Sequence, residues 1–519
     1  MAENVRYIKD LSNDVNFGAD SVLITETNGS TRKISGQKLS DELASLALIT
    51  DSTGIMGNKG ENVSQLALEA ATAALAMDNQ SKIINLELFT NYISEDIYGI
   101  EVDAENDRIT RVAAAENLQA GDNFDKIYEM RRCNISDNGI VNAYYGDEGY
   151  TEDGSNGQVM VEIPAMYYKV APIKLMKISD TANSKGYHNI KSRYYVTRTP
   201  HTGFKLHPAF YDENGKVCEK IYVGAYEACL YDTSAAAYNT DDSQTMDASA
   251  DLLSSIAGVK PTSGKTQNFT RVNAEQTAKN RGTGWHNQSA KVVSLIQLLF
   301  AVEYASFNWQ SALGQGVTGV SDDSTNNCSS LTGSTASLGN TSGNATATIN
   351  EKGGVRTTET AANKVAISWR GIENFFGNIW KFVNGISFWG DGQMQAGEPY
   401  ICSDFSYAEN KKDGNYAAVG FYLPASGGYI KNFGYSEEFD WLFIPSRTGG
   451  HSAMTVAGDY TWLTENLKGY RLAPLGGAWN SWSSAGAFCW NCYSSVGSRS
   501  RSIGGRLVYA SHGNEEDVA

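Results

Sequence analysis

One segment of the chain limits the fold more than any other, because it predicts a helix that is apolar on nearly every side. It runs from Ser289 to Trp309 and reads SAKVVSLIQLLFAVEYASFNW. Ser289 is a residue type that caps helix starts. A helix without a polar face must be buried in protein. Its longest apolar run, 292–302, is too short to cross a bilayer, which needs about 20 residues. We therefore expect one long helix buried in a globular body.

Most of the remaining sequence predicts short β-strands joined by turns. The chain has 519 residues with 51 glycines and only 9 prolines, a composition suited to many turns. Residues 157–175 predict two strands broken at Pro164, and residues 220–230 predict another strand. The region 314–360 is rich in Gly, Ser, Thr and Asn and predicts turns or irregular hairpins exposed to solvent. We expect a β-rich fold from about residue 98 onwards.

The N-terminal region predicts a different organisation. Residues 21–34 alternate strand-forming residues around Asn28-Gly29, which is a strong hairpin signal. A short helix is predicted at about residues 38–48. In the following helix, apolar residues recur at alternating spacings of three and four, at Val63, Leu66, Ala70, Ala73 and Met77. This is the spacing of a coiled-coil seam, but it covers only about two heptads, and an ordinary amphipathic helix fits it as well.

The charge distribution disfavours one class of partner. The net charge is -16, whereas proteins that bind the phosphate backbone of nucleic acids need clustered Lys and Arg. Residues 471–512 are locally basic, since they contain four arginines and no acidic residue. Such an end favours an anionic partner. The alternative is that some of these arginines pair with acids elsewhere in the fold, which we expect for Arg506.

The sequence contains no recognisable catalytic or metal-binding motif. The seven cysteines are odd in number and widely scattered, so they do not predict disulfides. Cys489 and Cys492 form a lone CxxC without the further ligands that zinc requires. None of the six histidines forms a metal-like pair. Glu227 and Glu303 fall in predicted buried elements, where a carboxylate needs partners, so we expect them to stabilise the fold.

These observations lead to three general expectations. We predict no cofactor, no bound metal and no enzymatic activity. No signal peptide is visible at the N-terminus. The sequence therefore predicts a soluble protein that is made in a reducing cytoplasm.

The C-terminal segment 476–502, GGAWNSWSSAGAFCWNCYSSVGSRSRS, has the composition of a contact surface. Large aromatic rings supply contact area at low entropic cost, and small polar residues supply adaptable hydrogen bonds, as in antibody paratopes. Trp, Tyr and Arg are also the residue types that dominate binding hot spots. The alternative is a Gly/Ser-rich loop that covers one end of a β-domain, with its tryptophans in the core. The composition alone does not choose between the two.

Six blocks occur in one order along the chain: GFKLHPAF (203–210), IYVGAYEA (221–228), NRGTGWHNQS (280–289), the long helix, WRGIENFFGNIWKFVNGI (369–386), and a last block that begins GGAWN and ends IGGRLVYA (476–510). Together they resemble the C-type-lectin-like domain that the formylglycine-generating-enzyme superfamily shares with phage tail proteins. The resemblance covers roughly residues 98–510. It implies an α+β fold class, with a C-type-lectin-like fold at the C-terminus, a β-rich middle, and a small N-terminal hairpin followed by helices that include a short trimeric coiled coil.

Within that superfamily the blocks are most similar to the variable proteins of diversity-generating retroelements, such as the phage major tropism determinants. In that family a reverse transcriptase misreads template adenines and rewrites codons in a C-terminal variable repeat. Randomising the adenines of Asn codons yields residues such as Ser, Tyr, Cys and Arg, but never Lys, Glu, Gln, Met or Trp. The resemblance therefore implies that Trp479 and Trp490 are fixed scaffold and that 503–507 closes the fold. It leaves Trp482 unassigned.

The resemblance implies a phage tail receptor-binding protein, located at the tail tip or fibre of the virion. We expect a virion-attachment and helical neck region at 1–82, a β-rich connecting region at 83–160, and a receptor-binding domain at 161–519 with a variable segment at 476–506. The implied partners are a bacterial cell-surface receptor, protein or glycan, and phage tail or baseplate proteins that hold the N-terminus. The family's assemblies imply a homotrimer. Neither nucleic-acid binding nor membrane insertion is expected.

The resemblance also divides the residues into contact and scaffold positions. The expected receptor contacts are Ala478, Asn480, Ser481, Trp482, Ser484, Cys489, Asn491, Tyr493, Ser494, Ser498, Arg499, Ser500 and Arg501. The expected structural residues are Trp369, Gly377, Asn378, Trp380 and Arg506.

Two alternative functions on the same fold remain open. The first is an oxidase of the formylglycine-generating type, which uses a cysteine pair, although Cys489 and Cys492 do not lie in that enzyme's sequence context. The second is a structural tail or baseplate protein that is not diversified. Calcium-dependent lectins carry EPN or QPD followed by WND, but this chain has Glu398-Pro399-Tyr400 and no WND. Sugar binding through calcium is therefore not supported, and sugar binding by other means stays open.

Overall fold

The computed structural model describes the backbone of residues 21–25 and 31–35, and residues 95–512 apart from 122–123, 180–183, 241–243, 266–267, 323–324, 351–355, 393–396 and 409. The chain divides into two compact units, residues 1–93 and 94–519. In the first unit, β1 (Ser21–Thr25) pairs antiparallel with β2 (Thr31–Ser35). This confirms the predicted hairpin. The predicted helix at 38–48 and the seam from Val63 to Met77 lie outside the described residues.

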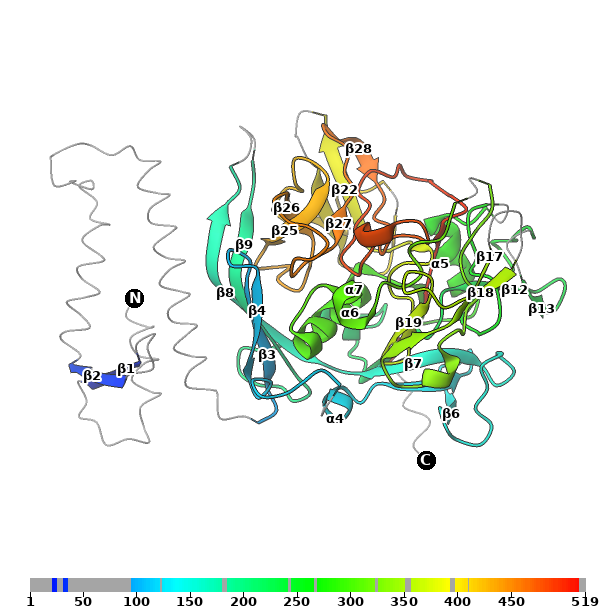
Figure 1. Cartoon of the computed structure of the whole chain (residues 1–519), viewed down its shortest axis with the longest axis horizontal. Coiled ribbons are helices and arrows are strands. Elements are labelled where there is room, and N and C mark those ends of the chain that lie inside the picture. Colours follow the sequence, from blue (N-terminus) through cyan, green and yellow to red (C-terminus); the bar gives the residue numbers. More distant parts are fainter. Residues whose placement is uncertain are drawn as a thin grey trace. The chain divides into compact units, whose positions relative to one another are not determined.

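Two large antiparallel sheets organise the second unit. The first sheet contains β3 (Tyr98–Asp103), β4 (Arg108–Ala113), β8 (Tyr167–Lys177), β9 (Tyr187–Thr197), β10 (Lys205–Leu206), β25 (Gly428–Tyr435), β26 (Pro445–Thr448) and β27 (Tyr460–Thr461). The second sheet contains β15 (Trp285–Asn287), β30 (Leu507–Tyr509), β11 (Lys220–Gly224), β7 (Gln158–Pro164), β5 (Arg131–Ile135) and β6 (Val141–Tyr144), in this spatial order. Figure 1 shows β3, β4, β8 and β9 side by side along one edge of this unit.

Smaller sheets and short helices complete the second unit. The small sheets pair β12 (Cys229–Asp232) with β13 (Ala237–Tyr238) and β14 (Leu252–Ser254); β16 (Gly343–Ala345) with β19 (Ala366–Trp369), which also pairs with β20 (Ile372–Glu373); β17 (Ala347–Asn350) with β18 (Arg356–Glu359); and β21 (Trp380–Lys381) with β29 (Ile503–Gly504). A four-stranded sheet has the order β24 (Tyr416–Ala418), β23 (Glu398–Cys402), β22 (Ile386–Asp391), β28 (Lys468–Arg471). The helices are α4 (Phe124–Tyr128), α5 (Arg271–Lys279), α6 (Ala290–Tyr304), α7 (Trp309–Leu313) and the 3-10 turns η2 (Pro208–Phe210), η3 (Ala336–Leu338) and η4 (Trp482–Ser484).

The predicted central helix is α6, and the structure confirms that it is buried. All its residues except Lys291 and Tyr304 are buried, and it contacts β3 and β9 of the first sheet (Figure 1). The Ser289 hydroxyl accepts a hydrogen bond from the Val292 amide, as expected of a helix cap. The helix ends earlier than the sequence predicts, because Ala305 takes a left-handed conformation with φ of 49°. Asn308 then caps the separate helix α7.

The strand predictions are confirmed in part. The segment 157–175 forms β7 and β8, with the break after Pro164 as predicted. The segment 220–230 is divided between β11 and β12 instead of forming one strand. The region 314–360 is not wholly exposed, because Val317, Val320, Cys328, Ala347 and Ile349 pack in a buried cluster with Trp479. This insertion therefore supports the C-terminal segment.

The described part of the expected middle region, from residue 95 to 160, shares sheets with the rest of the second unit. Strand β3 pairs with β9, and β5 pairs with β7, which also pairs with β11. The expected boundary at residue 160 falls inside β7. Across the second unit the described residues are predominantly in strands and turns, so the fold is β-rich. Within the same described part of the chain, no helix has both the length and the apolarity to cross a membrane.

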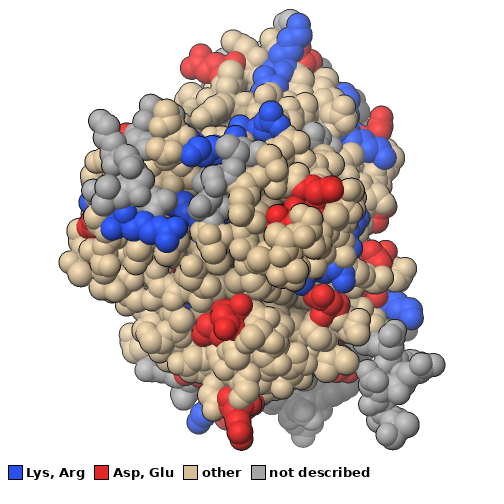
Figure 2. Space-filling view, turned by 90° about the vertical axis from the view of Figure 1, so that its right-hand side faces the viewer, with Lys and Arg blue, Asp and Glu red and all other residues tan. Residues whose placement is uncertain are grey.

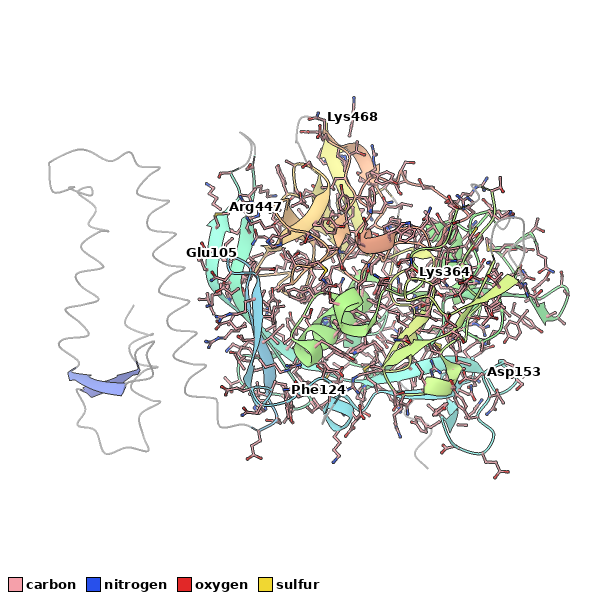
Figure 3. The ribbon with its side chains drawn as sticks, in the orientation of Figure 1. Glu105, Phe124, Asp153, Lys364, Arg447 and Lys468 are labelled. Carbon is pink, nitrogen blue, oxygen red and sulfur yellow. The ribbon has the colours of Figure 1, made fainter. Side chains whose placement is uncertain are left out.

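Two buried carboxylates stabilise the core, as the sequence predicts. Glu303 on α6 is fully buried and accepts hydrogen bonds from Trp369 Nε1 at 2.9 Å and from the Arg370 guanidinium at 2.7 and 2.9 Å. Glu227 is also fully buried, lies 3.0 Å from Lys381 Nζ, and accepts from Asn378 Nδ2 at 2.7 Å. Charged residues such as Glu105, Asp153 and Lys468 lie instead at the outer edges of the unit (Figure 3).

Candidate binding surface

The C-terminal segment is attached to the core by its tryptophans and its last arginine. Trp479 and Trp490 are fully buried, and Trp490 Nε1 donates to the Phe443 carbonyl at 3.1 Å. Arg506 is also fully buried, and it donates to the Gly224 carbonyl at 2.7 Å and to the carbonyls of Glu373 and Asn374. Its hydrogen bonds therefore reach backbone oxygens, not the side-chain acids that the sequence analysis expects.

The other residues expected to be structural surround this attachment. Trp369 is fully buried. Gly377 has φ of 71°, and a Cβ there would lie 3.0 Å from the Val317 carbonyl oxygen, so this close approach requires glycine. Asn378 also has a positive φ, and its carboxamide oxygen accepts from the Ser330 amide at 2.6 Å. Trp380 is only partly buried and pairs with Ile503 across β21 and β29.

The thirteen expected contact residues divide by burial. Three are buried: Ala478, Cys489 and Asn491. Their inclusion in the contact surface is corrected, because a side chain packed in the core cannot touch a partner. Asn491 instead supports the surface, since its side-chain oxygen accepts from the amides of Tyr493 and Ser494 at 3.2 and 3.1 Å. The partly or fully exposed positions are Asn480, Ser481, Trp482, Ser484, Tyr493, Ser494, Ser498, Arg499, Ser500 and Arg501.

Trp482 is the most exposed aromatic residue of the segment, with 56% of its surface accessible. Its backbone is held in a left-handed conformation with φ of 50°. The Trp482 amide donates to the Thr318 carbonyl at 2.8 Å, and Gln310 Nε2 donates to the Trp482 carbonyl at 2.9 Å. The turn η4 is thus held by hydrogen bonds to both α7 and the insertion 314–360, while the indole ring of Trp482 faces solvent. An aromatic anchor on a fixed backbone loses little entropy on binding.

Three aromatic residues from outside the C-terminal segment extend the same surface. The rings of Tyr429 and Tyr460 lie 5.4 Å apart, and those of Tyr460 and Trp462 lie 4.6 Å apart. Tyr429 Oη is 3.1 Å from Ser483 Oγ, next to Trp482, and the Cys492 amide donates to the Trp462 carbonyl at 2.8 Å, next to Tyr493. We call Tyr429, Tyr460, Trp462, Trp482 and Tyr493 the aromatic surface.

Sequence reasoning did not identify Tyr429, Tyr460 and Trp462. A signal for two of them was present, because Tyr460-Thr461-Trp462 alternates large aromatic and small residues. In a strand this alternation places both rings on one face. The structure agrees, since Thr461 is buried while Trp462 is exposed.

One of the arginines of the segment pairs with an acid elsewhere in the fold, as the alternative in the sequence analysis expects, although the residue is Arg501 and not Arg506. The two terminal guanidinium nitrogens of Arg501, Nη1 and Nη2, each donate to an oxygen of the Asp322 carboxylate at 2.6 Å. The guanidinium carbon lies 5.5 Å from the Trp479 ring centroid. Asp322 belongs to the insertion, 179 residues earlier in the chain. Arg501 therefore fixes the insertion to the segment, whereas Arg499 is exposed. Figure 2 shows one face of the protein, on which charged side chains of both signs form small separate groups.

A buried carboxyl group, Asp459, lies beneath the aromatic surface. It is fully buried, and one oxygen accepts from the Phe488 amide at 2.7 Å, while the other has no hydrogen-bond partner. A Cβ at Gly486 would overlap this carboxylate, so the segment packs directly on it. Burial raises the pKa of Asp459 to about 8. The group therefore stays protonated at neutral pH.

This raised pKa predicts how the stability of the protein depends on pH. The folded state keeps the Asp459 proton while the unfolded chain loses it, so this group makes stability fall as pH rises from about 4 to about 8. Asp459→Asn is neutral at every pH. We expect the Tm of Asp459→Asn to rise relative to wild type as pH is raised through this window, measured by thermal melts at several pH values. A difference in Tm that is the same at pH 4 and pH 8 would contradict the assignment.

Two cysteine thiols lie in the segment that carries the aromatic surface, and their buried environment makes them unreactive. Cys489 and Cys492 are fully buried and free, and burial raises both thiol pKa values well above the ordinary range. Across the described part of the chain, no group of three or more His, Cys, Asp or Glu side chains is placed to hold a metal ion.

Comparison with known proteins finds structural likeness only. No protein-family model matches the chain, and no curated protein matches it. Solved structures of three Major Tropism Determinant variants are similar to it. The P3c variant is 12% identical, with 78% of this chain and 77% of that chain covered and a TM-score of 0.25. The U1 variant is 13% identical, with 73% and 72% covered and a TM-score of 0.24. The M1 variant is 14% identical, with 80% and 81% covered and a TM-score of 0.25. TM-scores of this size do not establish a shared fold.

Proposed function

We propose that this chain is a phage tail receptor-binding protein that contacts a bacterial surface molecule through the aromatic surface. In this proposal the second unit has a C-type-lectin-like fold, and the C-terminal segment is its variable part. The chain assembles as a homotrimer, and the N-terminal region attaches it to the tail or baseplate. The receptor is a protein or a glycan on the bacterial cell surface.

The observation that carries the proposal is that the C-terminal segment has two kinds of aromatic residue. Some are buried and fix the segment to the core, and others are exposed to solvent. Trp479 and Trp490 are buried, while Trp482 is 56% and Tyr493 is 46% exposed. Monomeric proteins rarely expose clustered large aromatic side chains without a binding role. The exposed serines and Asn480 around them supply the adaptable hydrogen bonds that paratopes use. This combination favours recognition over catalysis.

The alternative oxidase function receives less support from the site. An oxidase of the formylglycine-generating type needs reactive thiols, and a thiolate is the reactive form. Cys489 and Cys492 are buried with raised pKa values, and no substrate approaches them without opening the core. The other alternative, a tail protein that is not diversified, is tested on the DNA. An imperfect repeat of the codons for 476–506, differing at template adenines, would indicate diversification, and its absence near the gene would favour the second alternative.

Removing the two most exposed rings of the segment should abolish most host binding. Each of Trp482→Ala and Tyr493→Ala is expected to weaken binding by about 2 kcal/mol if it lies centrally in the interface, and the pair by more. Both side chains are largely exposed, so the variants should fold normally. The measurement is adsorption to host cells of particles that carry the double variant, with incorporation of the protein verified.

A matched control is Tyr145→Ala, because Tyr145 is 37% exposed but lies on the turn after β6, outside the aromatic surface. Its particles should adsorb as wild type does. Undiminished adsorption of the double variant would show that the receptor site lies elsewhere. If particles with Tyr145→Ala lose as much adsorption as particles with the double variant, general damage to the protein, and not the loss of receptor contacts, explains the reduced adsorption.

A further inference from the structure

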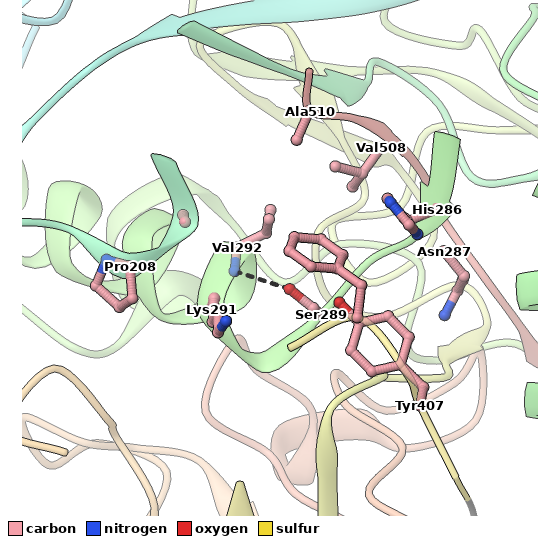
Figure 4. A pocket seen from close by; sticks show the side chains of 11 residues that line it. Pro208, His286, Asn287, Ser289, Lys291, Val292, Tyr407, Val508 and Ala510 are labelled. Carbon is pink, nitrogen blue, oxygen red and sulfur yellow. Dashed lines mark hydrogen bonds between the residues drawn. The ribbon is translucent and has the colours of Figure 1, made fainter. Parts of the chain in front are cut away.

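Two recesses of the second unit are too small for a ligand larger than a water molecule. The first lies at the start of α6, is lined by His286, Tyr407 and Val508 among others, and has a volume of about 10 Å³ (Figure 4). The second is lined by Tyr194 and Phe433 among others and has a volume of about 20 Å³. Each has room for about one water molecule. Neither can hold part of a receptor, so under the proposed function the aromatic surface recognises its partner through the spacing of its exposed rings.

Asp459 lies where the three segments of the aromatic surface meet. Its backbone carbonyl accepts a hydrogen bond at 3.0 Å from the amide of Ile430, the residue after Tyr429 in β25. It directly precedes Tyr460, the first residue of β27. Its side chain accepts from the Phe488 amide of the C-terminal segment at 2.7 Å. One residue thus connects all three segments.

The bond from the C-terminal segment to Asp459 is the first of three that hold this segment beside β27 and the residue after it, Trp462. The Trp462 amide donates to the Trp490 carbonyl at 2.9 Å, and the Cys492 amide donates to the Trp462 carbonyl at 2.8 Å. These two bonds join backbone groups, whereas the first uses the Asp459 side chain. Tyr493 follows directly, so the three bonds determine where its ring lies relative to Trp462.

The surroundings of the Asp459 carboxyl suit its neutral form. Among the described residues the Phe488 amide is the one group that bonds this side chain, and no cation forms an ion pair with it. Cys489 is a titratable neighbour, and burial raises its thiol pKa well above the ordinary range, so it stays protonated. His451 bonds the Ile430 carbonyl at 3.0 Å and not Asp459. An ionised Asp459 would therefore be a buried charge without a counterion, which is costly.

We propose that Asp459, with its carboxyl protonated, is a positioning residue that holds the C-terminal segment in register with β27 and so fixes the spacing between the rings of Trp462 and Tyr493. The consequence for receptor binding rests on the proposed function, because the aromatic surface is the proposed contact. The positioning itself does not depend on what the receptor is.

This role makes the closed segment sensitive to pH. Opening of the segment admits water to Asp459 and lets the carboxyl ionise. Burial raises the pKa of this group to about 8 in the closed segment, whereas a solvated Asp titrates at about pH 4. The opening constant therefore grows by about tenfold per pH unit between about pH 5 and pH 7. Asp459→Asn cannot ionise and keeps an acceptor for the Phe488 amide, so it should lack this dependence.

Hydrogen–deuterium exchange of the full-length protein, followed by mass spectrometry, measures the opening as protection factors, which are corrected for the intrinsic pH dependence of exchange. From about pH 5 to pH 7 we expect protection of the amides of 486–492 to fall by about 100-fold in wild type, and to stay nearly constant in Asp459→Asn. The hairpin of β5 and β6 is the internal control, because it lies at the edge of the second sheet and its local opening does not expose Asp459. Its protection should be the same in both proteins at each pH.

Adsorption of particles to host cells links the positioning to binding. Asp459→Ala removes the acceptor for the Phe488 amide, so it should lower protection of 486–492 by about tenfold at low pH and reduce adsorption. Asp459→Asn should restore most of both. Incorporation of each variant into particles is verified first.

Three outcomes would overturn the proposal. The first is the same pH dependence of protection in wild type and Asp459→Asn, a comparison that stays decisive if Asp459→Ala does not fold. The second is an equal difference between the two proteins in the β5–β6 hairpin, which would indicate general destabilisation. The third is normal adsorption of Asp459→Ala while the double variant Trp482→Ala and Tyr493→Ala fails to adsorb. If the double variant also adsorbs normally, the receptor proposal fails, and the exchange experiment still decides whether Asp459 positions the segment.

Discussion

Replacing Glu303 by alanine is expected to lower the free energy of unfolding by about 3–5 kcal/mol. The reason is that the buried cation of Arg370 remains after its carboxylate partner is removed. Arg370 is buried, and its guanidinium donates two of its hydrogen bonds to Glu303, at 2.7 and 2.9 Å. Without that carboxylate the buried cation keeps Asp125, at 2.6 Å, as its one charged partner among the described residues. Trp369 Nε1 and the Gly121 amide lose their acceptor as well. Urea denaturation followed by tryptophan fluorescence measures the change.

The matched control is Glu105→Ala, the same substitution at a surface ion pair. Glu105 lies 2.6 Å from Lys174, and both side chains are more than half exposed (Figure 3). Such pairs contribute little, so stability should change by less than about 1 kcal/mol. If Glu303→Ala unfolds at the same urea concentration as Glu105→Ala, the carboxylate does not hold the core together.

The second large effect is expected where β21 joins the C-terminal scaffold to the core. Lys381 and Glu227 are both buried, with their charged atoms 3.0 Å apart. Lys381→Met breaks this pair and leaves a buried carboxylate, which should cost about 3–5 kcal/mol of stability. Adding Glu227→Gln removes the uncompensated charge, and Asn378 keeps an acceptor at that position. The double variant should therefore be more stable than Lys381→Met alone.

The two single variants and the double variant form a thermodynamic cycle, measured by denaturant unfolding. We expect the double variant to lose less stability than the sum of the losses of Lys381→Met and Glu227→Gln, because the two charges compensate each other. Strictly additive losses would mean that Lys381 and Glu227 stabilise the fold separately, through their bonds to Gly377 and to the asparagines. The receptor-binding loss of an intact Lys381→Met variant should be small, because neither charge reaches the surface.

Local sequence patterns correctly predicted those elements whose structure follows from the residues of the element itself. Residues 290–304 form the buried helix because they have no polar face to turn towards water. The first hairpin, in which β1 pairs with β2, was predictable because Asn-Gly is the dipeptide that most favours the tight turns of hairpins. The burial of Glu227 and Glu303 with partners was predictable for the same kind of reason, since a carboxylate inside an apolar element needs donors.

The contact composition of the C-terminal segment was also visible in the sequence, but its geometry was not. Composition assigns Ala478, Cys489 and Asn491 the same role as Tyr493, whereas the structure buries the first three. In strands and turns a shift of one residue moves a side chain from the surface to the core. A segment made of turns has no regular alternation of side-chain directions, so its sequence does not show which side chains point into the core.

The sequence by itself determined that this chain is β-rich around one buried helix, and that its C-terminal segment combines aromatic rings with small polar residues. Only the tertiary structure decided which residues share that surface. Tyr429 and Tyr460 reach it from strands β25 and β27 of the first sheet, and Asp322 binds Arg501 across 179 residues of sequence. Local patterns report which side of an element is apolar, whereas the partner that covers or extends that side is set by how the whole chain packs.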